Sequence, residues 1–180
     1  MEEFNLNSTV TDKAYVRQVL AWETYRDAGV PASISFPMRV QQNGTFHSVS
    51  IFVEQPDERY LARQGLAPDG VLYKLLKLNV LDSSTVNVEK RTRLDEDHSD
   101  LQALIDGLML PPEQRAAYLY DHVDIPEVIN YLSVAAILHD RDQGDNNYYL
   151  YRDPEGHAGW MVLPWDKDMT FGRTCLLYTS

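Results

Sequence analysis

One stretch limits the possible folds of this chain more than any other: an apolar helix pattern that runs into an acidic loop. Asp124-Ile125-Pro126-Glu127 is a capping box with proline in the first turn, and it predicts a helix start. Residues 128–138 are mostly apolar, so we expect this helix to be buried on most sides. Residues 140–147 then carry three aspartates and two asparagines. The sequence therefore predicts a polar loop that is held on a rigid, buried support.

Helix-like and strand-like segments alternate along the rest of the chain without the βαβ rhythm of a parallel sheet. Thr11 is a good N-cap for a first helix, and Asn43-Gly44, between two β-like runs, is a strong hairpin signal. A polar stretch, 83–98, has the pattern of a loop or an irregular hairpin. The expected helices cover 12–28, 56–65, 99–108 and 113–122, and the expected strands cover 34–41, 46–54, 71–81, 148–152 and 159–164. We therefore predict the α+β class.

Composition excludes several classes of protein. The 180 residues are 44% hydrophobic and 11% aromatic, which argues against a disordered chain. No apolar run approaches the roughly 20 residues that a membrane helix needs, so we expect no membrane segment in this sequence. Lys and Arg total 16 against 27 Asp and Glu, and the net charge of −11 leads us to expect no nucleic-acid partner. A chain this acidic binds a polyanion only locally or through a metal ion, and its oligomeric state is not readable from the sequence.

The two ends of the sequence differ in character. The N-terminus is acidic and polar, and it does not have the pattern of a signal peptide. Cys175 is the single cysteine, which excludes an internal disulfide and a cysteine-rich zinc module. The segment Cys175–Ser180 resembles a translated sequencing adapter. We therefore expect residues 1–173 to form one domain that is incomplete at its C-terminus, and residues 174–180 to be a non-native tail.

The region 139–172 carries the clearest chemical pattern. A hairpin expected after the acidic loop would return the chain near its start, so Asp142, Asn147 and Asp166 are expected to converge in one small volume. Carboxylate and amide oxygens grouped in this way suit a hard cation such as Mg²⁺, Mn²⁺ or Ca²⁺. An Asp followed five residues later by an Asn, then by a hairpin and a second Asp, is also the layout of protein-kinase catalytic segments. The spacing therefore favours a cation site and is compatible with phosphoryl transfer.

Simpler explanations exist for several of these residues. Asp and Asn are common in solvated turns, so an acidic loop need not bind anything. An EF-hand fails on register, because Gly144 stands at position 5 from Asp140 and Tyr151 occupies position 12, where a bidentate Glu is needed. Lys167 lies between two aspartates, and we interpret it as charge neutralisation in a turn. Lys74, in a strand-like run, also fits a surface lysine whose stem lies along apolar surface.

Three short motifs stand in order near the end of the chain: Asn146–Tyr151, Pro164-Trp165-Asp166 and Thr170–Arg173. Earlier stretches that belong to the same set are Phe4–Ser8, Tyr25–Val30, Asn43-Gly44, Val53-Glu54 and Gly70–Lys74. Together they resemble the CotH kinase family, which includes the spore coat protein CotH and many bacterial relatives. The resemblance covers nearly the whole chain up to Arg173, and the motifs occur in the same order at plausible spacing.

The resemblance implies an atypical protein-kinase-like fold, present here as the small lobe and the catalytic-loop part of the large lobe. It also implies transfer of phosphate from ATP to Ser or Thr of a protein substrate, with Mg²⁺ or Mn²⁺. By this resemblance Asp142 is the catalytic aspartate, and Asn147 and Asp166 hold the metal. Asp168 is a further candidate metal ligand, and Lys74 is the candidate lysine that faces the phosphates.

Two more residues are candidates for the ATP side of the site. Glu54 is the candidate ion-pair partner of Lys74. Ser48 stands in the hairpin where relatives commonly carry Gly, which would let the backbone approach phosphate closely. A contact between this hairpin and nucleotide would therefore depend on the Ser48 N–H and hydroxyl. The chain also has no GxGxxG loop, so without the resemblance the pattern of an ordinary kinase is weak.

Two other functions fit the same residues. A non-catalytic, kinase-like structural or binding module would use the acidic loop to hold Ca²⁺. A small-molecule kinase would share the Asp, Asn and Asp layout but would turn over ATP without labelling protein. Metal-dependent ATP binding separates the first alternative from a kinase, and labelling of protein separates the second. The residues themselves do not indicate a compartment, and the resemblance implies a spore coat or the bacterial cell surface or extracellular space.

Overall fold

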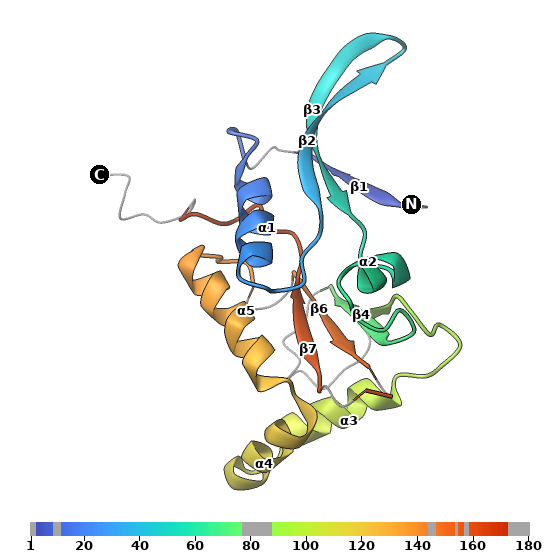
Figure 1. Ribbon diagram of the computed structural model, residues 1–180, viewed down its shortest axis with the longest axis vertical. Helices are drawn as coiled ribbons and strands as arrows, with labels where there is room; N and C mark the ends of the chain where they lie inside the picture. Colours follow the sequence, from blue (N-terminus) through green and yellow to red (C-terminus); the bar gives the residue numbers. More distant parts are fainter. Residues whose placement is uncertain are drawn as a thin grey trace.

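The computed structural model of the protein describes residues 3–8, 12–76, 88–143, 147–153, 155–156 and 159–172. Its helices and strands form a mixed α+β architecture with two antiparallel sheets (Figure 1). The predicted α+β class is therefore confirmed. Residues of four predicted segments lie outside the described residues, namely 77–81 of a strand, 83–87 of the polar stretch, 144–146 of the acidic loop and the tail 174–180.

The first sheet has the strand order β1–β3–β2, with β1 at Phe4–Asn7, β2 at Ser35–Gln42 and β3 at Thr45–Glu54. Asn43 and Gly44 join β2 to β3 with φ angles of 51° and 79°. A two-residue hairpin turn of type I′ needs such left-handed values at both central residues. The predicted hairpin is confirmed. Its tip projects well beyond the rest of the molecule (Figure 1).

The second sheet has the strand order β5–β4–β6–β7, and all its pairings are antiparallel. Its strands are β4 (Val71–Leu75), β5 (Val88–Lys90), β6 (Tyr148–Arg152) and β7 (Met161–Pro164). The central strands β4 and β6 are buried along almost their whole length. Strand β5 comes from the polar stretch that was expected to be a loop or an irregular hairpin, and it pairs with β4 as a hairpin strand does.

The helices are α1 (Arg17–Asp27), α2 (Glu58–Arg63), α3 (Ser99–Leu108), α4 (Pro112–His122) and α5 (Ile125–Ile137). Asp57 caps α2 by accepting the Tyr60 N–H at 2.9 Å. Asp124 accepts the Glu127 N–H at 3.2 Å, which confirms the cap predicted for α5. Helix α5 packs against β7, and α1 packs against β2 and α5. Both sheets and these two helices therefore contribute to one hydrophobic core.

The first helix is shorter than predicted. It begins at Arg17 rather than at Asp12, and Tyr15 just before it has a left-handed φ of 59°. Asp12 is buried, and its carboxylate accepts the Arg17 N–H at 2.7 Å and the Ala14 N–H at 3.1 Å. These side-chain bonds hold the preceding residues in a turn and delay the helix. The predicted N-cap, Thr11, lies outside the described residues.

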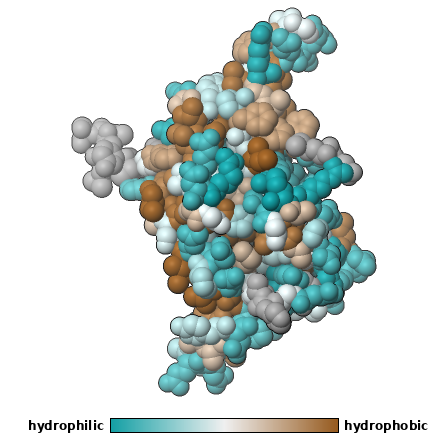
Figure 2. Space-filling model, viewed as in Figure 1, coloured by the Kyte–Doolittle hydropathy of each residue, from teal (hydrophilic) through white to brown (hydrophobic). Residues whose placement is uncertain are grey.

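Helix α5 is also less buried than its sequence predicts. Ile129, Leu132 and Ile137 are exposed to 57%, 49% and 72%, whereas Tyr131 and Val134 are buried. Figure 2 shows hydrophobic surface along the flank where α5 lies. The prediction that this helix is covered on most sides is wrong, because its neighbours cover one side. Within the described ranges, no helix combines the length and the apolar character needed to cross a membrane.

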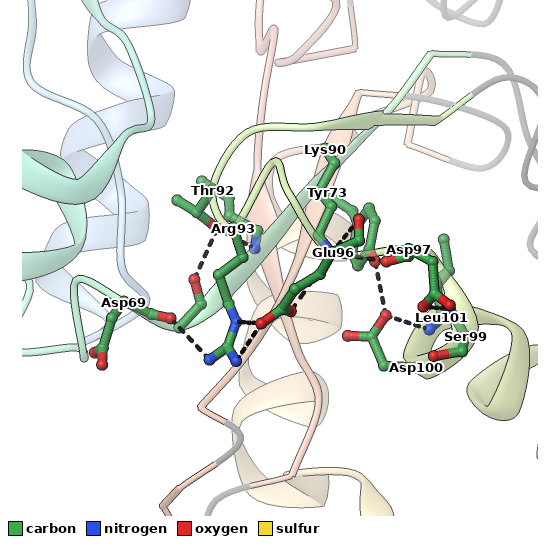
Figure 3. Close-up of polar contacts among 12 residues, drawn as sticks. Asp69, Tyr73, Lys90, Thr92, Arg93, Glu96, Asp97, Ser99, Asp100 and Leu101 are labelled. Carbon is green, nitrogen blue, oxygen red and sulfur yellow. Dashed lines mark hydrogen bonds and ion pairs between the residues drawn. The ribbon is translucent and has the colours of Figure 1, made fainter.

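Hydrogen bonds from the segment after β5 and from α3 hold β4 of the second sheet in place (Figure 3). The Thr92 hydroxyl donates to the Gly70 carbonyl at 2.7 Å and accepts the Leu72 N–H at 2.8 Å. The Tyr73 hydroxyl donates to Asp100 Oδ1 at 2.7 Å, which ties the strand to the first turn of α3. These contacts keep β4 in a fixed position relative to α3.

Candidate active site

The candidate active site lies where the loop after α5 meets the segment after β7. Strands β6 and β7 are antiparallel neighbours, with Tyr148 paired to Pro164, so the chain leaves β7 beside the start of β6. The Trp165 N–H donates to the Asn147 carbonyl at 3.0 Å. This bond extends the pairing of β6 and β7 by one residue on each side. The hairpin therefore brings the acidic loop and the Trp165 segment together, as the spacing predicts.

Asp142 and Asn147 are in direct contact. Asn147 Nδ2 donates a hydrogen bond to Asp142 Oδ2 at 2.6 Å. Burial raises the pKa of the Asp142 carboxyl, and the charges of Asp140 and Asp168 raise it further, while the bond from Asn147 opposes the shift. Asn147 has a left-handed φ of 65°, which is uncommon for a residue other than glycine. Two of the three residues that were expected to converge thus touch each other.

Asp166 lies within electrostatic reach of the same group. Burial raises the pKa of its carboxyl from 3.8 to about 6, with further increases from the charges of Asp168 and Asp142. The positive charges of Lys167 and Lys74 oppose this shift. The backbone of Asp166 is also left-handed, with a φ of 48°. The charges of Asp142 and Asp168 therefore act on the Asp166 carboxyl.

Lys74 is placed on β4 beside this cluster. It pairs with Tyr149 of β6, and its Nζ lies 5.0 Å from the centre of the Trp165 ring. Trp165 is buried and meets Tyr149 edge to face at 5.5 Å. Lys74 is half-buried, and its positive charge acts on the Asp166 carboxyl, so it lies in the neighbourhood of the Asp166 segment.

Glu54 and Ser48 occupy other surroundings. The Glu54 carboxylate forms an ion pair with Arg63 of α2, with Arg63 Nε donating to Oε1 at 2.9 Å. The ion pair predicted between Glu54 and Lys74 is therefore not formed, because Arg63 on the following helix is the nearer cation. Ser48 is half-buried in β3 of the first sheet, where its hydroxyl lies 3.4 Å from that of Ser50.

The structure adds residues that the sequence analysis did not place in the site. Lys167 is fully buried, and its Nζ donates to Asp140 Oδ2 at 2.7 Å and to the Asn147 carbonyl at 3.0 Å. Lys167 does neutralise charge, but in a buried ion pair and not in an exposed turn. Gln18 of α1 reaches Asp166 Oδ1 at 3.5 Å from 148 residues away, and no local pattern could have shown this.

The acidic residues are suited to a divalent cation, although they are not arranged as a finished metal centre. Among the described residues, no group of three or more His, Cys, Asp or Glu side chains is close enough together to hold a metal ion. The charge of Asp168 nevertheless raises the pKa of Asp142 and of Asp166, the charge of Asp142 also raises that of Asp166, and Asn147 adds an amide oxygen. Oxygen donors of this kind are what Mg²⁺ and Mn²⁺ prefer, and a cation would relieve the repulsion.

The fold and the site together define a mixed α+β protein in which carboxylate and amide side chains meet between the loop after α5 and the segment after β7. The family model described as CotH kinase protein matches residues 1–177, and the chain belongs to this family. The resemblance carried by the motifs is confirmed. The chain is also 28% identical over 184 residues to inner spore coat protein H of Bacillus subtilis (strain 168). That alignment covers 95% of this chain and 50% of the relative, so the chain spans about half the length of the curated relative it matches.

Proposed function

We propose that this protein transfers the γ-phosphate of ATP to Ser or Thr of a protein, with the help of a divalent metal. The observation that carries the proposal is the bond of 2.6 Å between Asn147 and Asp142 beside the carboxylate of Asp166. Lys74 adds a positive charge next to this group. Membership of the CotH kinase family supports ATP as the phosphate donor.

Asp142 is the residue we assign to the proton. The substrate hydroxyl oxygen forms a bond to the γ-phosphorus, while the bond between that phosphorus and the bridging oxygen of ADP breaks. The Asp142 carboxylate orients the hydroxyl and accepts its proton. The hydrogen bond from Asn147 fixes the direction in which Asp142 points. A positioned base of this kind contributes roughly 10²–10⁴-fold to the rate.

Asn147 and Asp166 are the residues that would hold Mg²⁺ or Mn²⁺, with Asp168 as a third ligand. A bound divalent ion would supply neutralising charge to the ATP phosphates and would let a chain of net charge −11 bind a polyanion. Lys74 would pair with phosphate oxygens on the side of β4. Ser48 would offer its N–H and hydroxyl from the β2–β3 hairpin.

The substrate and the compartment are proposed from the relative. The related protein is named as an inner spore coat protein of Bacillus subtilis. We assign to this chain a protein substrate of the same setting, such as a spore coat or cell-surface protein rich in Ser and Thr. The location that follows is the spore coat or the cell surface.

The test is transfer of labelled γ-phosphate from Mg·ATP to a Ser/Thr-rich protein by the full chain. We expect Asp142→Asn to lower the transfer rate by roughly 10²–10⁴-fold. Asp95→Asn is the matched control, because Asp95 is an exposed aspartate outside the site, and this variant should transfer at the original rate.

Each other outcome contradicts a named part of the proposal. Full turnover by Asp142→Asn would overturn the role of that residue. ATP turnover without labelled protein would favour a small-molecule kinase. A folded chain that neither transfers phosphate nor binds ATP in a Mg²⁺-dependent way would favour the structural module.

A further inference from the structure

We infer that Lys167 is a positioning residue of the active site, an inference that rests on the proposed function. Its buried ammonium group bonds to Asp140 and to Asn147, which lie on either side of Asp142 in the sequence. Lys167 itself belongs to the segment that carries Asp166 and Asp168. It therefore connects the proposed base, the proposed metal ligands and the hairpin between them.

The first connection runs to Asn147. Lys167 Nζ donates to the Asn147 carbonyl at 3.0 Å, and the Trp165 N–H donates to the same oxygen at 3.0 Å. Both lone pairs of this carbonyl are therefore used by the segment after β7. These two bonds hold the Asn147 carbonyl in place, while the Asn147 side chain donates its hydrogen bond to Asp142.

The second connection runs to Asp142 through Asp140. Lys167 Nζ donates to Asp140 Oδ2 at 2.7 Å, and Asp140 Oδ1 accepts the Asp142 N–H at 3.2 Å. The Asp140 carboxylate is therefore a bridge between the ammonium group and the backbone of the proposed base. Both members of the Asp142–Asn147 hydrogen bond are fixed at their backbones by contacts that lead to Lys167.

The backbone conformation shows why such a clamp is needed. Asn147 and Asp166 have φ angles of 65° and 48°, in the left-handed region that Asn and Asp enter more easily than other residues with a side chain, but that is still uncommon for them and is stabilised here by surrounding contacts. Lys167 is bonded to the first and is the sequence neighbour of the second. A loop of this composition that lacked the clamp would relax toward ordinary backbone angles and would turn Asn147 away from Asp142.

The alternative is that Lys167 only balances the buried charge of Asp140. The two roles separate in the double variant Lys167→Met/Asp140→Asn, which removes both charges and leaves no unpaired ion in the core. Asn at position 140 still offers an oxygen to the Asp142 N–H. Lys13→Met is the matched control, because Lys13 is exposed and distant in sequence from the site.

The experiment compares the double variant with the unchanged full chain in three measurements. Thermal unfolding reports whether the fold survives. Binding of Mn²⁺ in the presence of ATP and the rate of phosphate transfer report on the site. We expect a folded double variant whose Mn²⁺ affinity and transfer rate are both 10–100-fold lower, the range seen when a residue that orients metal ligands is removed. Lys13→Met should change neither.

Hydrogen exchange of the Trp165 backbone amide gives a result that does not depend on activity. This N–H donates to the Asn147 carbonyl, so its protection in the metal-free protein shows whether Asn147 stays in place. We expect at least tenfold faster exchange in the double variant, with the amides of the β2–β3 hairpin unchanged.

The failures of the two proposals are distinguishable. Unchanged Trp165 exchange, or unchanged Mn²⁺ binding and transfer in the double variant, would overturn the role of Lys167 and leave the kinase proposal standing. An unchanged chain that binds no Mn²⁺ with ATP and transfers nothing would overturn the proposed function. The exchange measurement would still decide whether Lys167 holds Asn147.

Discussion

The β2–β3 hairpin and the candidate active site both turn the chain through left-handed backbone, but they do so for different reasons. In the hairpin the left-handed residues are Asn43 and Gly44, which are adjacent and tolerate this conformation by their own chemistry. In the site they are Asn147 and Asp166, nineteen positions apart in the sequence and joined through a hairpin. The first turn is therefore a local property, and the second depends on tertiary contacts.

The contacts around the two turns show the same difference. The hairpin tip projects into solvent, and its partners are the next residues along the same two strands. The site is held by Lys167, whose bond to Asp140 spans 27 positions, and by Trp165. A functional group needs a fixed direction, and in this protein it is the distant contacts that fix it.

Removal of the buried partner of Lys167 should give the largest change in stability. Asp140→Ala leaves an ammonium group in the core without its carboxylate, and breaking a buried pair in this way costs about 3–5 kcal/mol. The free energy of unfolding in urea measures the loss, with Asp95→Ala as the exposed control. A loss below about 1 kcal/mol would mean that the pair is more hydrated than its burial indicates.

Neutralising Asp166 should increase the stability of the metal-free protein, in contrast to the loss expected for Asp140→Ala. Its pKa is raised to about 6 in the folded protein from 3.8, so the folded state binds more protons than the unfolded state between about pH 4 and pH 6. The ionised carboxyl therefore destabilises the metal-free fold above about pH 6, and this effect disappears as the pH falls toward 4. Asp166→Asn should stabilise the metal-free protein at pH 7 by roughly 2–3 kcal/mol, at 1.36 kcal/mol per pKa unit.

The measurement for Asp166→Asn is the unfolding free energy against pH, together with Mg²⁺-dependent ATP binding. We expect the gain in stability to vanish near pH 4 and the ATP binding to be lost. A variant that is less stable than the original chain at pH 7 would show that Asp166 supports the fold and is not a strained functional group.

A change in the hairpin turn should have the smallest effect and should not reach the site. Gly44→Val places a β-branched residue at a φ of 79°, which costs roughly 1–2 kcal/mol. Unfolding in urea measures this loss, and the neighbouring change Thr45→Val, on an exposed strand position, is the control. Mg²⁺-dependent ATP binding should be unchanged in both. A loss of binding would show that the conformation of the Asn43-Gly44 turn is needed to hold Ser48 at the nucleotide site.

Local signals in the sequence predicted local structure well. The Asp124 side-chain cap of α5 and the turn at Asn43-Gly44 both form as expected, because each depends on residues within a few positions of each other. The reciprocal half of the capping box is replaced by a bond from the Asp124 N–H to the Trp160 carbonyl at 3.0 Å. The predicted start of α1 was wrong. The Asp12 side chain accepts hydrogen bonds from the Arg17 and Ala14 amides, and these bonds compete with the backbone bonds of a helix.

The predicted burial of α5 was wrong for a different reason. An apolar composition predicts that part of a helix is buried, but it does not determine how many sides of the helix are buried. The positions of α1 and β7 decide that, and they leave Ile129 and Ile137 at the surface.

The sequence by itself determined the α+β class, the family and the approach of Asn147 to Asp142, because the motifs and the hairpin spacing can be read directly from the order of residues. Only the tertiary structure decided that Glu54 pairs with Arg63 and that Lys167 is buried against Asp140. A side chain's partner is the nearest group of opposite charge in space. Distance in space between residues far apart in the sequence is fixed only when the sheets and helices pack.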